Sequence, residues 1–152
     1  MKTLPIVAGF FAALSLGSGS PAQATDLDNA EKLRKLDIML MVTSLRCRTG
    51  ADAFQPEYQA FSKQQLAHLN GASRALESNL SKRHGAKGGK RALDKISVGM
   101  ANRYGNGHPW MSCGELKNKT RELTGAAGQA ELLAAADELL ADDRNIRIAA
   151  GR

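Results

Sequence analysis

The chain has 152 residues, a formal net charge of +6 and 43% hydrophobic residues. This length fits one domain with a modest core. No stretch approaches the roughly 20 consecutive apolar residues that a membrane-spanning helix needs, so composition excludes an integral membrane protein with several spans.

The first 24 residues have the order of a secretory signal peptide. Lys2 supplies the positive end, residues 4–16 the apolar run, and Ala22-Gln23-Ala24 the small-residue cleavage site. We expect cleavage after Ala24, which makes residues 25–152 the mature helical domain and predicts a periplasmic or secreted protein. The apolar run, about 13 residues, is short for a bilayer, so we expect no transmembrane segment in the mature chain. An uncleaved anchor is the alternative.

Charge is unevenly distributed along the mature chain. Residues 74–121 contain eleven Lys and Arg against three acids, a local excess of +8, whereas six acids face three arginines from Glu122 onward. A basic middle favours an anionic partner. For an exported protein we expect an anionic envelope component or an acidic protein, and no nucleic acid. The alternative is a solvated basic face that binds nothing specific.

The chain contains two cysteines, Cys47 and Cys113. In an oxidising compartment they most simply pair with each other. The bridge would close a loop of about 66 residues, for which the chain-entropy model predicts a stabilisation of about 4 kcal/mol. The rival interpretation, a reactive or metal-binding thiol pair, lacks C-x-x-C spacing.

Hydrophobic spacing predicts an all-α fold, a single small bundle of four to five helices stapled by one disulfide. The first helix is expected to begin at the capping residues 25–28 and to end before Gly50. Its leucine stripe consists of Leu33, Leu36 and Leu40. The apolar face is widened by Met39, Met41, Val42 and Leu45. This pattern predicts a central helix that is buried on most sides.

A second helix is predicted from Pro56, which suits a first helical turn, to His84, before Gly85. Residues 85–90, Gly-Ala-Lys-Gly-Gly-Lys, are then expected to form a flexible basic loop. They match neither the spacing of a Walker loop nor that of a dinucleotide-binding loop, and no strand precedes them. A third helix is predicted over residues 91–104.

The stretch after the third helix contains the densest group of rare residues. Gly105-Asn106-Gly107 breaks the chain, and Ser112 with Glu115 matches the capping box that starts a helix. Cys113 would then be the first residue of a fourth helix that ends at Thr124-Gly125. A last helix, residues 129–140, has an acidic outer face that could pack back over the basic middle.

Two kinds of site are conceivable around this stretch. His108 and Glu115 are candidate acid–base catalysts, because a histidine beside a carboxylate can exchange protons near neutral pH. The alternative makes Glu115 a capping residue, His108 a hydrogen-bonding loop residue and Trp110 a core residue beside the disulfide. The histidines lack i, i+4 spacing, so we expect no metal site. We also expect no cofactor.

The second kind of site is an anion pocket near the disulfide. Arginine forks suit carboxylate or phosphate, and the free amides at the start of the fourth helix would assist. Candidate ligand-binding residues are Arg46, Arg48, Arg103, Tyr104, His108 and Trp110. The alternative is that the arginines complement helix ends and face water.

Three motifs carry a family resemblance: R-C-R-T-G, F-Q-P-E-Y-Q-A-F and M-A-N-R-Y-G-N-G-H-P-W-M-S-C-G-E-L. On them the chain resembles a family of short, uncharacterised exported bacterial helical proteins with two cysteines, over most of residues 36–123. The resemblance implies export but no activity. Such chains sometimes bear the label S-adenosyl-L-homocysteine hydrolase, which this sequence does not support, because that chemistry relies on NAD held by a parallel-sheet domain with a G-x-G-x-x-G loop.

The function predicted from the sequence is that of an exported, disulfide-stabilised helical protein of the cell envelope, a binding or structural module with a basic face. The alternative is a small periplasmic enzyme with a site around His108, Glu115 and nearby arginines. A more distant hypothesis is a stress chaperone that resembles small two-cysteine acid-protection proteins.

Overall fold

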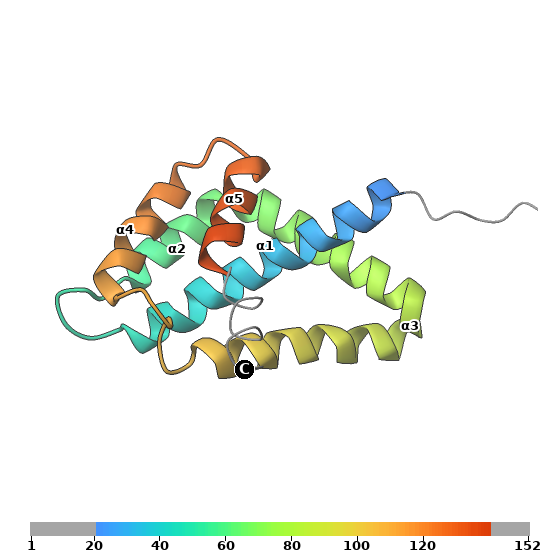
Figure 1. Ribbon diagram of the computed structural model, residues 1–152, viewed down its shortest axis with the longest axis horizontal. Coiled ribbons are helices and arrows are strands. Elements are labelled where there is room, and N and C mark those ends of the chain that lie inside the picture. Colours follow the sequence, from blue (N-terminus) through green and yellow to red (C-terminus); the bar gives the residue numbers. More distant parts are fainter. Residues whose placement is uncertain (1–20, 141–152) are drawn as a thin grey trace, which may run out of the picture.

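A computed structural model describes residues 21–140, and this part of the chain forms five α-helices and no strand (Figure 1). The helices are α1 (Pro21–Arg46), α2 (Gln55–Gln64), α3 (Leu66–Tyr104), α4 (Cys113–Thr124) and α5 (Gln129–Leu139). The predicted all-α bundle is confirmed. No helix within residues 21–140 has both the length and the apolar content to cross a membrane.

Helix α1 is the centre of the bundle. It packs along α3 and also contacts α2, α4 and α5, and Figure 1 shows it crossing between that cluster of short helices and the two arms of α3. Its leucine stripe, Leu33, Leu36 and Leu40, is fully buried. The predicted apolar face is too wide, however, because Met41 is 37% and Leu45 49% exposed.

The N-terminal boundary of α1 differs from the prediction. Helical structure is already present at Pro21, ahead of the expected caps at residues 25–28. The expected cleavage point after Ala24 therefore falls within α1. The apolar run of the predicted signal peptide, residues 4–16, lies outside the described residues. Residues 141–152, the end of the acidic tail, lie outside them as well.

The predicted second helix is divided in two at Gln65. The side chain of this residue is buried, and its Nε2 donates to the carbonyl oxygens of Leu123, Thr124 and Ala126 at 3.1–3.2 Å. Leu123 and Thr124 belong to the last turn of α4 and Ala126 follows it, so these carbonyls lie where helical partners run out. A contact with a segment some 60 residues away in sequence therefore accompanies the break between α2 and α3.

The glycine-rich stretch was predicted to be a loop, and this prediction is wrong. Helical structure continues through residues 86–90, and only Gly85 departs from it, with φ +72° and ψ 167°. That backbone conformation is open essentially only to glycine. A Cβ on Gly89 would lie 2.8 Å from backbone atoms of Ser81, so the glycine lets the two arms meet closely. The stretch is a tight corner between a proximal arm (66–84) and a distal arm (86–104).

The start of α4 agrees with the sequence. The amide of Ser112 donates to Glu115 Oε2 at 2.7 Å, and the amide of Glu115 donates to Ser112 Oγ at 3.3 Å, which completes the capping box. Cys113 is the first residue of α4 and is bonded to Cys47, which directly follows α1, with a Cα–Cα distance of 5.8 Å. The predicted disulfide is confirmed and joins a helix end to a helix start.

Candidate functional site

Three rings lie together at the loop between α3 and α4. Tyr104 is 1% exposed and its ring stacks on that of His108, with 5.4 Å between the ring centroids. His108 in turn meets Trp110 edge-on at 4.3 Å. Trp110 is 43% exposed, so its expected alternative role as a core residue is wrong. Offset and edge-on pairs of this kind add stability beyond the area they bury.

His108 also connects this loop to α5. Its Nε2 lies 3.1 Å from the carbonyl oxygen of Leu139, the last residue of α5. Carbonyls in the last turn of a helix lack helical partners, so a ring N–H aimed at one of them acts as a C-terminal cap. This contact gives His108 a structural role of the kind the sequence offered as the alternative to catalysis.

The capping box engages the second candidate catalyst. Glu115 accepts both from the backbone amide and from the hydroxyl of Ser112, and these hydrogen bonds hold the pKa of its carboxyl below the usual range. A general acid or base works best with a pKa near the operating pH, which a lowered carboxyl pKa opposes. The hydrogen bonds of Glu115 are made with Ser112. Catalysis by His108 and Glu115 therefore stays a prediction.

The three candidate arginines line two different cavities. Arg46 and Arg48 contribute to one of about 410 Å³, which also includes Gly105. Arg103 contributes to one of about 620 Å³ between α1 and the distal arm of α3, and its guanidinium lies 5.5 Å from the Tyr104 ring centroid.

The cavity beside Arg46 and Arg48 is formed where two helices end. Arg46 is the last residue of α1, and Gly105 directly follows α3. Helix C-termini carry partial negative charge, which offsets part of the positive charge of the two arginines. Anion binding there stays a prediction, and the amides of α4's start are not among the lining groups.

Cations of the basic middle that lie on α4 are paired with acids. Arg121 donates to Glu57 on α2 at 2.7 Å, and Lys117 lies 3.8 Å from the same carboxylate. Lys119 pairs with Glu138 of α5 at 2.9 Å. The acidic face of α5 therefore does pack over part of the basic middle, namely α4, and it also reaches α1 through Lys32, which pairs with Asp137 at 2.8 Å.

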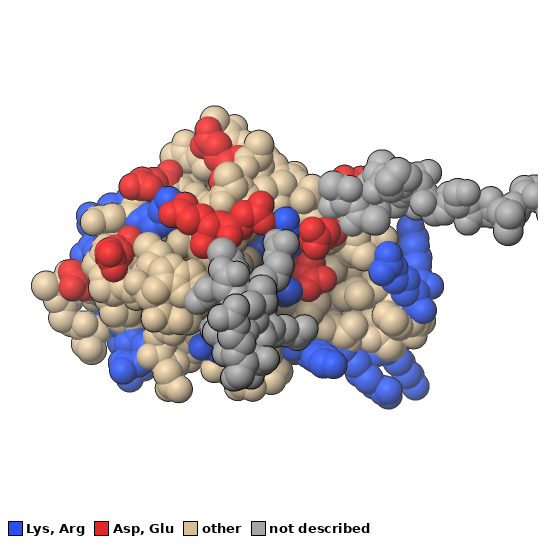
Figure 2. Space-filling model, in the orientation of Figure 1, with Lys and Arg blue, Asp and Glu red and all other residues tan. Residues whose placement is uncertain are grey.

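The corner of α3 has a second group of cations, which make no ion pairs with acids among the described residues. We call residues 82–91 the elbow; its cations are Lys82, Arg83, Lys87, Lys90 and Arg91, all exposed. None of the five takes part in an ion pair within residues 21–140, and residues 78–93 contain no acid. Figure 2 shows Lys and Arg gathered at this end, away from the acids over α1 and α5.

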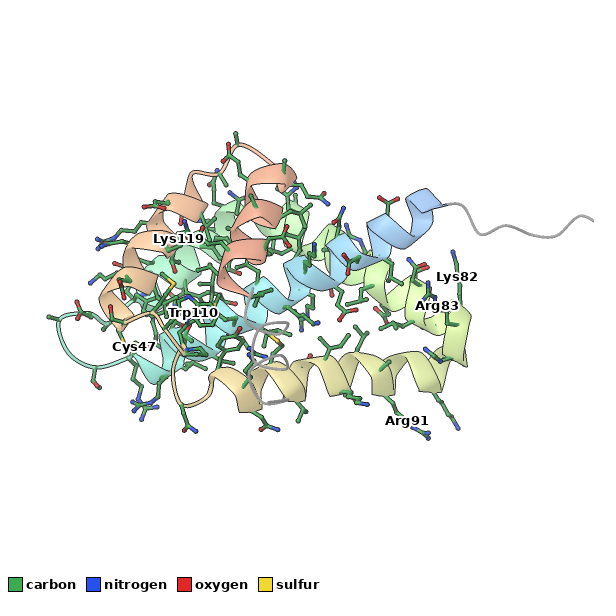
Figure 3. All side chains as sticks on the ribbon, in the orientation of Figure 1. Cys47, Lys82, Arg83, Arg91, Trp110 and Lys119 are labelled. Carbon is green, nitrogen blue, oxygen red and sulfur yellow. A yellow bond between two sulfur atoms is a disulfide. The ribbon has the colours of Figure 1, made fainter. Side chains whose placement is uncertain are left out.

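The elbow side chains point away from the bundle. Figure 3 shows Lys82, Arg83 and Arg91 projecting outward at one end of the molecule, while Lys119 and Trp110 lie at the other. The segment matches no phosphate-binding motif. The signal that marks it is a run of five cations without an intervening acid.

Comparison with protein-family models, with curated proteins and with solved structures finds no match. Among residues 21–140, no three His, Cys, Asp or Glu side chains are grouped so as to hold a metal ion. Any assignment of function therefore rests on the geometry and charge of the chain itself.

Proposed function

We propose that this chain is an exported helical binding module that docks through its elbow onto an anionic phospholipid surface of the cell envelope. The observation that carries the proposal is the contrast between paired and unpaired cations. Those of α4 have acidic partners on α2 and α5, whereas the five of the elbow have none within residues 21–140. The elbow is therefore a strong local source of positive potential.

The shape of the elbow suits an extended surface. Lys82 and Arg83 belong to the proximal arm, and Lys87, Lys90 and Arg91 to the distal arm. Because the arms meet at a tight corner, Lys82 and Arg83 of the proximal arm and Arg91 of the distal arm project from the same end of the molecule (Figure 3). A projecting corner can bring its cations to one plane. None of the five lines the cavity beside Arg46, the one between α1 and the distal arm, or the one between α4 and α5.

The expected binding is weak and sensitive to salt. A Lys or Arg near an anionic bilayer contributes about 1 kcal/mol, so five contribute about 5 kcal/mol. That corresponds to an affinity weaker than micromolar. The elbow lacks a large exposed hydrophobic residue, so the attraction is electrostatic and decays over about one Debye length, roughly 8 Å at physiological salt.

The test compares two variants with the same change in net charge. One replaces Lys87, Lys90 and Arg91 of the elbow by Gln; the control replaces Lys117, Lys119 and Arg121 of α4 by Gln. Co-sedimentation with phosphatidylglycerol vesicles, and with phosphatidylcholine vesicles as the neutral reference, measures binding in about 20 mM and about 300 mM salt.

Three lost surface cations predict a loss of about 100-fold in the elbow variant, and a much smaller loss in the α4 variant, whose cations already have acidic partners. Wild-type binding should fall with salt and require the anionic lipid. Equal losses in the two variants would overturn the proposal. So would binding to phosphatidylglycerol that does not respond to salt, or equally strong binding to phosphatidylcholine.

A further inference from the structure

A groove separates α1 from the distal arm of α3. Its volume, about 620 Å³, falls within the range of sites that take small ligands. It shares no residue with the five elbow cations, so it is a second feature of the molecule. The lining residues are Glu31 and Lys35 of α1 and, from the distal arm, Ala92, Lys95, Ile96, Gly99, Met100 and Arg103.

The distal arm provides the groove with an apolar stripe. Ala92, Ile96 and Met100 are spaced four residues apart, so they stand one above another on the same side of the helix. Gly99 lies beside them and leaves an opening: a Cβ placed on it would meet no atom within 4 Å. Glycine is a poor helix former, so neither close packing nor helix propensity accounts for it here.

The rim of the groove is basic. Lys35 Nζ lies 2.7 Å from Glu31 Oε1, so the one acid in the lining already has a cationic partner. Lys95 is exposed and makes no ion pair with any residue between 21 and 140. With Arg103 included, the lining carries three cations and one acid. The groove therefore combines an apolar floor with a net positive edge.

We propose that this groove binds a single-chain amphiphile with an anionic head, of the fatty-acid class. The hydrocarbon chain would lie on the partly buried Ala92 and Ile96, next to the buried Met100, and the carboxylate would meet the exposed ammonium of Lys95. A wholly apolar ligand would take water from the ammonium of Lys95 without giving it a partner. A small inorganic anion would leave the exposed parts of Ala92 and Ile96, which are only partly buried, uncovered. An anionic amphiphile satisfies both surfaces.

The first experiment separates the contributions of chain and head. Isothermal titration calorimetry on the intact protein would use dodecanoate below its micelle concentration, dodecyltrimethylammonium, which has the same chain with a cationic head, and acetate, which has the head without the chain. We expect saturable 1:1 binding of dodecanoate, at least about tenfold tighter than that of either comparison compound. Equal binding of the two dodecyl compounds, or no binding of dodecanoate at about 1 mM, would overturn the proposal.

The second experiment fills the groove. Gly99→Leu puts a side chain into the opening, and we expect dodecanoate binding to weaken at least about tenfold while the Tm stays at or above that of the wild type. Gly71→Leu is the matched control, because Gly71 is also in α3, also has no atom within 4 Å of an added Cβ, and does not line the groove. Unchanged binding in Gly99→Leu would refute the site.

The charge of the rim is tested separately. Lys95→Gln should weaken dodecanoate binding by about tenfold, because a charge-assisted contact is lost, and should leave the binding of dodecyltrimethylammonium no weaker than before. The elbow variant with Lys87, Lys90 and Arg91 replaced by Gln should bind dodecanoate like the wild type. The two proposals can thus fail independently: one by loss of vesicle binding through the elbow, the other by loss of dodecanoate binding in the groove.

Discussion

The Nε2 atom of His108 lies 3.1 Å from the carbonyl oxygen of Leu139, so the loop after α3 caps the C-terminal end of α5. The two residues are 31 positions apart in sequence. The contact joins the loop after α3 to the end of α5, and together with the Tyr104 stack it accounts for much of the rare-residue cluster at positions 104–110.

His108→Phe should reveal the value of this cap. The variant keeps a ring to stack on Tyr104 but loses the hydrogen bond, so we expect the free energy of unfolding to fall by about 1 kcal/mol in urea denaturation. His84→Phe, at an exposed elbow position, should stay within about 0.5 kcal/mol of the wild type. Equal stability of His108→Phe and the wild type would contradict the capping role.

A hydrolase screen that compares the wild type with His108→Ala tests the catalytic alternative. That alternative requires the variant to lose an activity that the wild type has.

Gln65 is the second residue that caps a distant helix. Gln65→Met has a similar length but no donor, and it leaves carbonyls of Leu123, Thr124 and Ala126 without this partner. We expect a loss of about 1–3 kcal/mol in unfolding free energy. Gln64→Met is the control at the adjacent exposed position and should change stability little. A loss of equal size in both variants would show that the buried amide has no special role.

The Cys47–Cys113 bridge should contribute a large share of the stability. Replacing both cysteines by Ala removes a cross-link with a sequence separation of 66, and the expected loss is about 4 kcal/mol. Thermal unfolding of the wild type should shift strongly downward when reductant is added. The double variant should show the same Tm with and without reductant; a wild-type Tm that ignores reductant would count against this prediction.

Replacing Gly85 and Gly99, both in α3, by Ala should change the stability in opposite directions. Gly85→Ala forces a side chain into a backbone region that only glycine adopts readily, and should cost about 1–3 kcal/mol. Gly99→Ala has open space and ordinary helical geometry, and should stabilise by about 0.5–1 kcal/mol. Chemical denaturation measures both. If Gly85→Ala were as stable as the wild type, the tight corner would not form in solution.

Two carboxyl groups should affect the pH dependence of stability in opposite directions. Burial opposes the charge of Glu57, but its backbone hydrogen bond, the hydrogen bond from Arg121 and the charge of Lys117 outweigh this and lower its pKa below the usual 4.5. The folded state therefore binds this proton less readily than the unfolded state. The stability from Glu57 is present above about pH 4.5 and is lost as the pH falls through the lowered pKa.

Glu57→Gln should thus be less stable than the wild type at pH 7, by up to about 1 kcal/mol for a partly exposed ion pair. The difference should shrink on acidification.

Burial of Asp37 raises its pKa above 3.8 despite the hydrogen bond from Tyr58. Its contribution to the stability of the folded state therefore falls as the pH rises. The unfolding free energy of Asp37→Asn should therefore increase relative to that of the wild type as the pH rises. Urea denaturation between about pH 3 and pH 7 measures both trends.

Several features of the fold could be predicted because they depend on short-range chemistry. The period of the leucine stripe in α1, the capping box of Ser112 and Glu115, and the glycine-limited end of α4 arise from residues within a few positions of each other. The disulfide was predictable because the chain has only two cysteines. These features suffice for the fold class and for the joint between α1 and α4.

The candidate site was less predictable, because its residues are brought together or kept apart by distant segments. Arg46 and Arg103 line separate cavities, since they lie on different helices whose packing no local pattern encodes. The exposure of Trp110 and Leu45 likewise depends on which helices fail to cover them. Rarity of residue types alone could not distinguish a cap from a catalyst at His108.

By itself, the sequence determined that the chain forms amphipathic helices, where α4 begins, and which cysteines pair, because these follow from periodicity, capping and composition. Only the tertiary structure decided that the helix predicted from Pro56 breaks at Gln65, that the glycine-rich run is a helical corner, and which cations keep no acidic partner among the described residues. The physical reason is that these outcomes depend on free energies of contact between segments far apart in the chain, which a local pattern does not contain.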